Sequence, residues 1–185
     1  MTTPEPAVTG PVPDIGLPAA PQRYVTDVRV RYSDLDAQGH VNNARVLTLL
    51  EEARVDWLYA DAPRHGADQL VRALVVASLE IQYRRPIQFG PPARVSLGVT
   101  AVGGASFTVD YVITSDGRVV ATASTVLVAV ELADGRPRRL GDRERSYLAT
   151  YRAPYAEGEE PTVRSHYPDA DDGSAGGYRY AAWSR

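Results

Sequence analysis

One segment of this sequence is patterned as a helix, whereas every other long apolar run alternates as a strand does. Between residues 46 and 57 the apolar side chains recur every three or four positions and fall on one arc of a helix: Val46, Leu49, Leu50, Ala53 and Trp57. The acidic residues Glu51, Glu52 and Asp56 lie outside that arc. A helix with so broad an apolar face must bury it against another element, so the strands should form a sheet against it.

The strands are predicted from alternation with a period of two. Apolar residues alternate with charged ones over residues 28–32, and the runs after the helix cover residues 77–83, 95–99, 107–113 and 119–130. The turn signals Gly103-Gly104 and Ser115-Asp116-Gly117 favour antiparallel hairpins. The order of strand, helix and four strands indicates an α+β domain, which a short helix near residues 142–151 is expected to close.

The length of 185 residues is typical of one domain. Residues 1–22 hold six of the fourteen prolines and are predicted to be a disordered leader. Residues 152–185 are rich in glycine, serine, proline and acidic residues, which predicts a flexible tail. The folded domain is therefore expected over residues 23–151.

Composition excludes several classes of function. The net charge of −3 leaves no basic excess for non-specific nucleic-acid binding. The chain has no cysteine, which excludes disulfides, thiolate catalysis and cysteine-ligated zinc, and it has no lysine, so phosphate contacts would come from arginine, hydroxyls or backbone N–H groups. It shows neither a signal peptide nor an apolar run near the roughly 20 residues that span a membrane. A cytoplasmic location is expected.

The connection between the first strand and the helix carries the candidate chemistry. Gly39 permits a tight turn, and Asn42 or Asn43 is a good N-cap for the helix. A carboxylate on this turn, from Asp34 or Asp36, would lie near the N–H groups that open the helix, and the same groups could hold a carbonyl oxygen as charge develops on it. In the alternative interpretation, the acids only form the turn and the asparagines only cap the helix.

Two motifs in this region resemble a known family. The first begins at the turn and continues into Leu50-Glu51-Glu52-Ala53-Arg54 of the helix; its opening residues are Asp36-Ala37-Gln38-Gly39-His40-Val41-Asn42-Asn43. The second is Tyr83-Arg84-Arg85-Pro86, at a plausible distance along the chain. At this spacing the sequence resembles the 4-hydroxybenzoyl-CoA thioesterase family, and within it the bacterial long-chain acyl-CoA thioesterases. The likeness covers most of residues 25–148.

The resemblance implies a hotdog fold, in which a curved antiparallel sheet wraps one long central helix. It also implies that subunits pair as a homodimer or a dimer of dimers, with active sites at the interface and acyl-CoA as substrate. Asp36 would act as general base or as nucleophile, and the backbone N–H of Asn43 would polarise the thioester carbonyl. Neither a metal nor another cofactor is expected.

Five further residues are candidates for the site. His40 is either a second base or a residue that packs beneath the turn. Glu51 is a solvated helix position that could approach the partner's substrate, and Val46 stands where relatives usually carry an aromatic residue near the acyl group. Arg84 and Arg85 either contact the phosphates of coenzyme A or form a charged strand end that resists edge pairing.

Two other functions remain open on the sequence alone. The chain could bind acyl-CoA without hydrolysing it, or it could hydrolyse thioesters of acyl carrier protein. A Gly-x-Ser-x-Gly motif is missing from the sequence, which disfavours the serine mechanism of an α/β-hydrolase. The length of the acyl group cannot be read from these residues.

Overall fold

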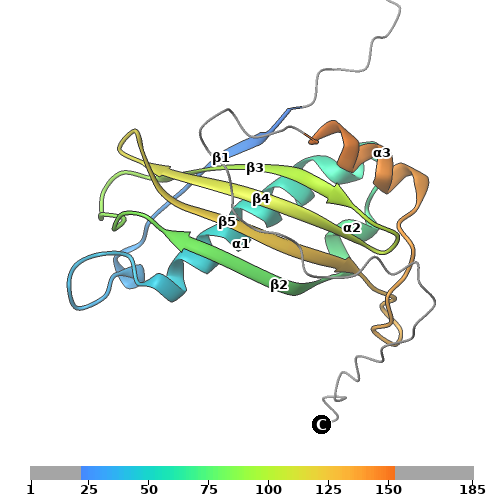
Figure 1. The fold of residues 1–185 in the computed structure, drawn as a ribbon, viewed down its shortest axis with the longest axis horizontal. Coiled ribbons are helices and arrows are strands. Elements are labelled where there is room, and N and C mark those ends of the chain that lie inside the picture. Colours follow the sequence, from blue (N-terminus) through green and yellow to red (C-terminus); the bar gives the residue numbers. More distant parts are fainter. Residues whose placement is uncertain (1–21, 153–185) are drawn as a thin grey trace, which may run out of the picture.

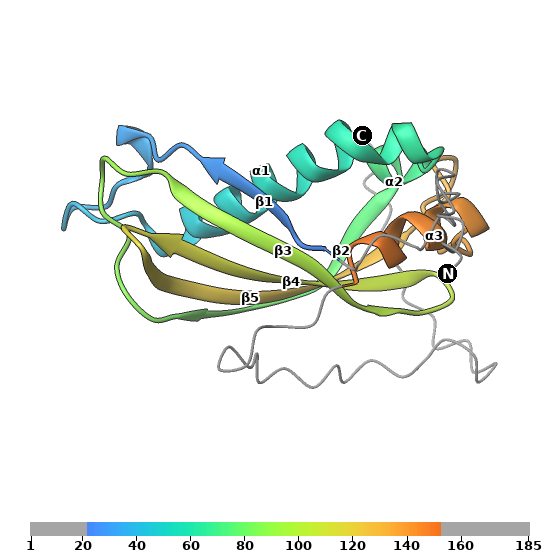
Figure 2. The same cartoon turned by 90° about the horizontal axis from the view of Figure 1, so that it is seen from above.

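The computed structural model describes residues 22–152, which form a five-stranded antiparallel sheet with one long helix, α1 (Asn43–Asp61), lying across one face (Figures 1 and 2). The sheet order is β1-β3-β4-β5-β2. The strands are β1 (Tyr24–Val28), β2 (Leu74–Tyr83), β3 (Ala93–Val102), β4 (Ser106–Ser115) and β5 (Arg118–Ala129). The predicted order of strand, helix and four strands is confirmed.

The core lies between α1 and the sheet. The helix arc predicted from the sequence is buried, with Leu50, Ala53 and Trp57 no more than 1% exposed. The alternation of β3 and β4 turns one face of each strand toward the helix, and the side chains on that face are almost wholly buried: Val95, Leu97, Val99, Val109, Tyr111 and Ile113. The apolar periodicity therefore sets both the helix face and the strand register.

The first strand lies earlier in the chain than the alternation of residues 28–32 predicted. β1 ends at Val28, which pairs with Ala93, the first residue of β3. Because β3 begins at Ala93, no β3 residue is left to pair with the residues after Val28, and β1 ends there. The chain then turns through a short 3₁₀ helix, η1 (Tyr32–Asp34), in which Tyr32 is 80% exposed. Val30 still packs into the core. The alternation over residues 28–32 therefore predicted correctly that Val30 is buried, but wrongly that it pairs in a strand.

The C-terminal end of α1 is covered by short helices. The chain continues through η2 (Ala62–His65) and α2 (Gln69–Arg72), and α3 (Asp142–Thr150) follows the sheet, which confirms the expected closing helix. Tyr147 of α3 stacks on Trp57 with ring centroids 5.6 Å apart, and Tyr151 meets the same indole edge-on at 5.3 Å. Aromatic packing thus fixes this end of the long helix.

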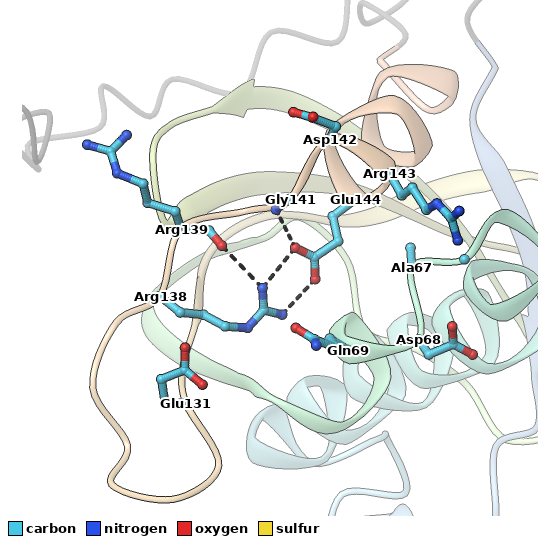
Figure 3. A pocket seen from close by; sticks show the side chains of 11 residues that line it. Ala67, Asp68, Gln69, Glu131, Arg138, Arg139, Gly141, Asp142, Arg143 and Glu144 are labelled. Carbon is cyan, nitrogen blue, oxygen red and sulfur yellow. Dashed lines mark hydrogen bonds and ion pairs between the residues drawn. The ribbon is translucent and has the colours of Figure 1, made fainter.

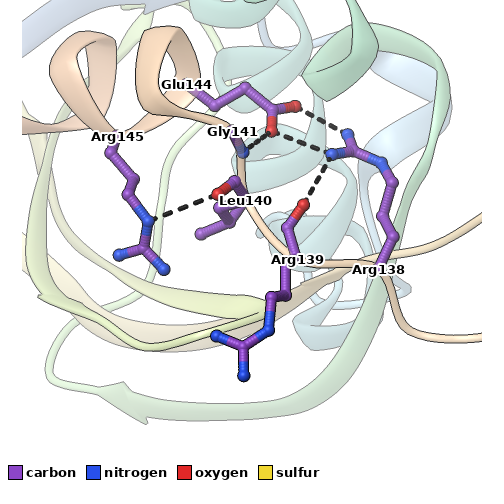
Figure 4. Close-up of polar contacts among 6 residues, drawn as sticks. All are labelled: Arg138, Arg139, Leu140, Gly141, Glu144 and Arg145. Atoms are coloured by element: carbon purple, nitrogen blue, oxygen red, sulfur yellow. Dashed lines mark hydrogen bonds and ion pairs between the residues drawn. The ribbon is translucent and has the colours of Figure 1, made fainter.

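A buried ion pair anchors the connection from β5 to α3 (Figure 4). The guanidinium of Arg138 donates to both carboxylate oxygens of Glu144, at 2.8 and 2.6 Å, and these side chains are only 9% and 7% exposed. The same carboxylate accepts the N–H of Gly141 at 2.7 Å, immediately before the helix. An acid in the first helical turn is also favoured by the helix dipole.

The predicted leader and tail fall almost entirely outside the described residues and stay predictions. Among residues 22–152, no helix is both long and apolar enough to cross a membrane.

Candidate active site

The turn that precedes α1 is closed by its own backbone. The N–H of Asp36 donates to the carbonyl of His40 at 2.8 Å, and an isolated antiparallel bridge joins Leu35 to Val41. Gly39 has a φ of 80°, a left-handed conformation that favours glycine, and its N–H donates back to the Asp36 carbonyl. The turn therefore has one defined shape before any substrate binds.

The Asp36 side chain lies over this turn and is half-buried. Its Oδ1 accepts the N–H groups of Gln38, at 2.8 Å, and His40, at 3.2 Å. No described residue donates a hydrogen bond to its other oxygen, Oδ2. The carboxylate thus braces the turn, as the alternative interpretation expected, and still has one oxygen available to a water molecule or a substrate.

The helix beginning leaves one backbone donor unused. Asn42 is the N-cap, because its Oδ1 accepts the N–H of Ala44 at 2.9 Å. The Asn42 carbonyl accepts the next two N–H groups, those of Arg45 and Val46. Among the described residues, none accepts the N–H of Asn43. This is the donor at the positive end of α1 that a developing negative charge would meet.

Asp34 is distinguished from Asp36 by its surroundings. It is 7% exposed, and its carboxylate accepts the N–H of Arg31 at 2.8 Å. Its carbonyl accepts the N–H of Asn42 at 2.8 Å, which ties the cap to the preceding turn. Asp34 is therefore the buried acid that braces the turn, and Asp36 is the more exposed acid of the pair.

Tyr83 also belongs to this region, although the sequence did not single it out as a site residue. Its hydroxyl donates to the carbonyl of Asn43 at 2.8 Å and holds the helix start against the end of β2. Burial raises the pKa of Tyr83, so the hydroxyl keeps its proton and remains a donor. The only sequence signal was its place at the head of the Tyr83-Arg84-Arg85-Pro86 motif.

The remaining candidates lie around this turn in different environments. His40 is half-buried and held through its backbone, and Val46 is 2% exposed within the core. Glu51 is exposed on α1, where it pairs with the buried guanidinium of Arg54 at 3.4 Å.

Arg84 and Arg85 are both exposed and follow directly after β2. Arg85 donates from Nη1 to the carbonyl of Val119 at 2.8 Å. The two guanidinium groups make no ion pair with any residue between 22 and 152. They are therefore accessible to an anionic ligand.

A cavity of about 690 Å³ lies far from this turn (Figure 3). It is lined by residues 66–69, Glu131 and the segment that leads into α3, at the C-terminal end of α1. The helix has 19 residues and so measures roughly 28 Å, which separates the cavity from Asp36. Arg138 and Glu144 on its wall neutralise each other.

Comparison with known proteins decides the family. Residues 30–142 match the family model of the thioesterase-like superfamily. The chain belongs to this superfamily. The thioesterase family and the hotdog fold expected from the sequence are thus confirmed, as is the assignment to the thioester hydrolases.

Individual relatives support the same family. The long-chain acyl-CoA thioesterase FadM of Escherichia coli K12 is 36% identical over 109 residues, which cover 58% of this chain and 83% of FadM. The 1,4-dihydroxy-2-naphthoyl-CoA hydrolase of Synechococcus elongatus is 30% identical over 122 residues, covering 64% of this chain and 90% of the hydrolase. A thioesterase from Thermus thermophilus, solved with coenzyme A and zinc, aligns with a TM-score of 0.60 and 31% identity over 69% of this chain and 93% of that one.

Proposed function

We propose that this thioesterase hydrolyses acyl-CoA to a free carboxylic acid and coenzyme A at the turn that opens α1. The observation that carries the proposal is the unused N–H of Asn43 on the same closed turn as Asp36, whose Oδ2 is open. The relatives named for acyl-CoA and naphthoyl-CoA substrates support the substrate class.

The proposed chemistry needs only these two groups and a water molecule. The thioester carbonyl oxygen accepts the Asn43 N–H, which stabilises the negative charge of the tetrahedral intermediate. Asp36 takes a proton from water as the water oxygen bonds to the carbonyl carbon. The intermediate then collapses, the C–S bond breaks, and the proton passes to the coenzyme A thiolate. In the nucleophilic variant, an Asp36 oxygen bonds to the carbonyl carbon, and the C–S bond breaks as coenzyme A leaves as its thiolate. Water then cleaves the resulting anhydride, which releases the carboxylic acid, regenerates the Asp36 carboxylate and supplies the proton that the thiolate takes up.

A second copy of the chain is part of this proposal. On α1 the exposed apolar residues Leu47, Val55 and Tyr59 follow one another along a face with a spacing of four, with Glu51 between them. β2 is an edge strand on which Val76 and Tyr83 are 46% and 45% exposed. Covering this surface with a partner would bury apolar area and bring Glu51 toward the partner's site. Sedimentation equilibrium should therefore give the mass of a dimer or a dimer of dimers.

The direct test is thiol release from a panel of acyl-CoA thioesters. Asp36→Asn keeps the size of the side chain but removes the base, so kcat should fall by about 10²- to 10⁴-fold. Asp134→Asn is the control for loss of a carboxylate, because Asp134 is exposed in the segment after β5 and pairs only with the exposed Arg136, and it should keep wild-type activity. Near-normal turnover by a folded Asp36→Asn variant would refute the assignment.

The same assay separates the other two functions. Tight binding of acyl-CoA without any thiol release by the wild-type protein would identify a binding protein. Faster turnover of acyl carrier protein thioesters than of acyl-CoA at equal acyl length would identify the carrier-protein thioesterase.

A further inference from the structure

Two exposed aromatic rings lie against each other beside the candidate active site. Tyr32 of η1 and Phe89 of the β2–β3 connection are 80% and 54% exposed, and their ring centroids lie 6.1 Å apart at an interplanar angle of 87°. Both belong to segments that form the catalytic turn, because Tyr32 precedes Asp36 by four residues and Gln88 bridges to His40. Exposed aromatic surface beside a candidate active site is accessible to a ligand.

Cationic side chains lie close along the chain to both members of this aromatic pair. The connection that carries Phe89 begins with Arg84 and Arg85, which are exposed and unpaired with any acid in the described part of the chain. Arg31, next to Tyr32, is 61% exposed and contacts Glu52 at 3.3 Å. Guanidinium groups suit phosphate oxygens, because their planar N–H groups can donate to two oxygens together.

We propose that the Tyr32–Phe89 pair holds the adenine ring of coenzyme A, while Arg84 and Arg85 contact its phosphates. The inference rests on the proposed acyl-CoA substrate. Of the two ends of that substrate, only the nucleotide end combines a flat π system with anionic groups. An acyl chain is uncharged and gains little from rings that water reaches freely, whereas a base can stack on an exposed ring face. The flexible pantetheine arm joins this position to the thioester at Asn43.

The test compares one acyl group on two carriers, coenzyme A and pantetheine, because acyl-pantetheine lacks the phosphates and the adenine. For Tyr32→Ala and Phe89→Ala, kcat/KM for acyl-CoA should fall on the order of ten-fold through KM, as expected for the loss of one stacking contact. kcat/KM for acyl-pantetheine should stay unchanged. Tyr32→Phe keeps the ring and should retain wild-type values. Leu132→Ala removes another exposed apolar side chain, which is 73% exposed in the segment after β5, and it should leave kcat/KM unchanged for both substrates.

Each other result has a defined meaning. An equal fall with both substrates would place the rings at the acyl group or in the assembly of the site and would overturn the adenine assignment. Loss of the oligomer in Tyr32→Ala would assign the rings to a subunit contact and would also overturn the adenine assignment. Unchanged kinetics in both alanine variants would overturn that assignment too. In all three cases the proposed function stands if the wild-type protein hydrolyses acyl-CoA and acyl-pantetheine. If the wild-type protein hydrolyses neither, the proposed function itself is refuted.

Discussion

The proposed oxyanion donor can be removed without disturbing the helix that carries it. Asn43 is the first residue of α1, a position at which proline is tolerated because its missing N–H would have no helical acceptor. The preceding residue, Asn42, has φ −56° and ψ 136°, and this ψ lies in the extended range that a residue before proline requires. Since no described residue accepts the Asn43 N–H, Asn43→Pro deletes one donor and no hydrogen bond.

The expected effect is on rate and not on folding. Loss of one backbone donor to a developing oxyanion costs about 10²- to 10³-fold in kcat. Asn43→Ala is the matched control, since it removes the same exposed side chain but keeps the N–H, and it should stay near wild-type turnover. The thermal unfolding midpoints of both variants should lie close to that of the wild type.

The assay is thiol release at saturating acyl-CoA, with circular dichroism to confirm the fold. The reasoning is refuted if Asn43→Pro, folded and assembled as the wild type, turns over as fast as Asn43→Ala. Equal losses in both variants would instead assign the effect to the asparagine side chain.

The remaining predictions concern stability, measured as urea midpoints at one protein concentration. Glu144→Gln leaves Arg138 buried without its counter-charge and should cost about 3 kcal/mol or more, whereas Asp27→Asn at the exposed Arg94 pair should change little. Burial raises the pKa of Glu144, but hydrogen bonds from Arg138 and the Gly141 N–H outweigh burial and hold the pKa below its ordinary 4.5. The stability of the wild type should therefore fall as the pH drops below this value, and Glu144→Gln should lack this contribution to the pH dependence. Tyr111→Phe should be neutral or stabilising, because the buried hydroxyl makes no hydrogen bond of ordinary geometry with a described residue; a loss above about 1 kcal/mol would contradict this.

Much of the fold was readable because burial leaves a periodic trace. The spacing of Leu49, Leu50, Ala53 and Trp57 can be satisfied only by a helix with one covered face, and the glycine turns separate β3, β4 and β5. The end of β1 was not readable in the same way. Val28 and Val30 are both buried, but whether a buried valine also pairs depends on where β3 begins, and that is a property of the partner strand.

The candidate site was readable as a segment but not as an arrangement of atoms. The family motif selected Asp36 over Asp34, but only closure of the turn shows that Asp34 is buried while Asp36 remains partly exposed. The hydrogen bond from Tyr83 to Asn43 joins residues 40 positions apart, and no local pattern reports such a contact. Long-range geometry of this kind is set by the whole sheet.

The two ends of α1 differ in a way that links stability to chemistry. At the C-terminal end Trp57 lies under Tyr147 and Tyr151, and the Arg138–Glu144 pair fastens α3, which begins at the last residue of the superfamily match. At the N-terminal end none of the described residues accepts the N–H of the exposed Asn43, so this donor is open to water and, in the proposed mechanism, to the substrate. Mutations that loosen α3 should therefore lower the stability of the whole chain while kcat per folded molecule stays unchanged, because the turn proposed to be catalytic is closed by its own hydrogen bonds.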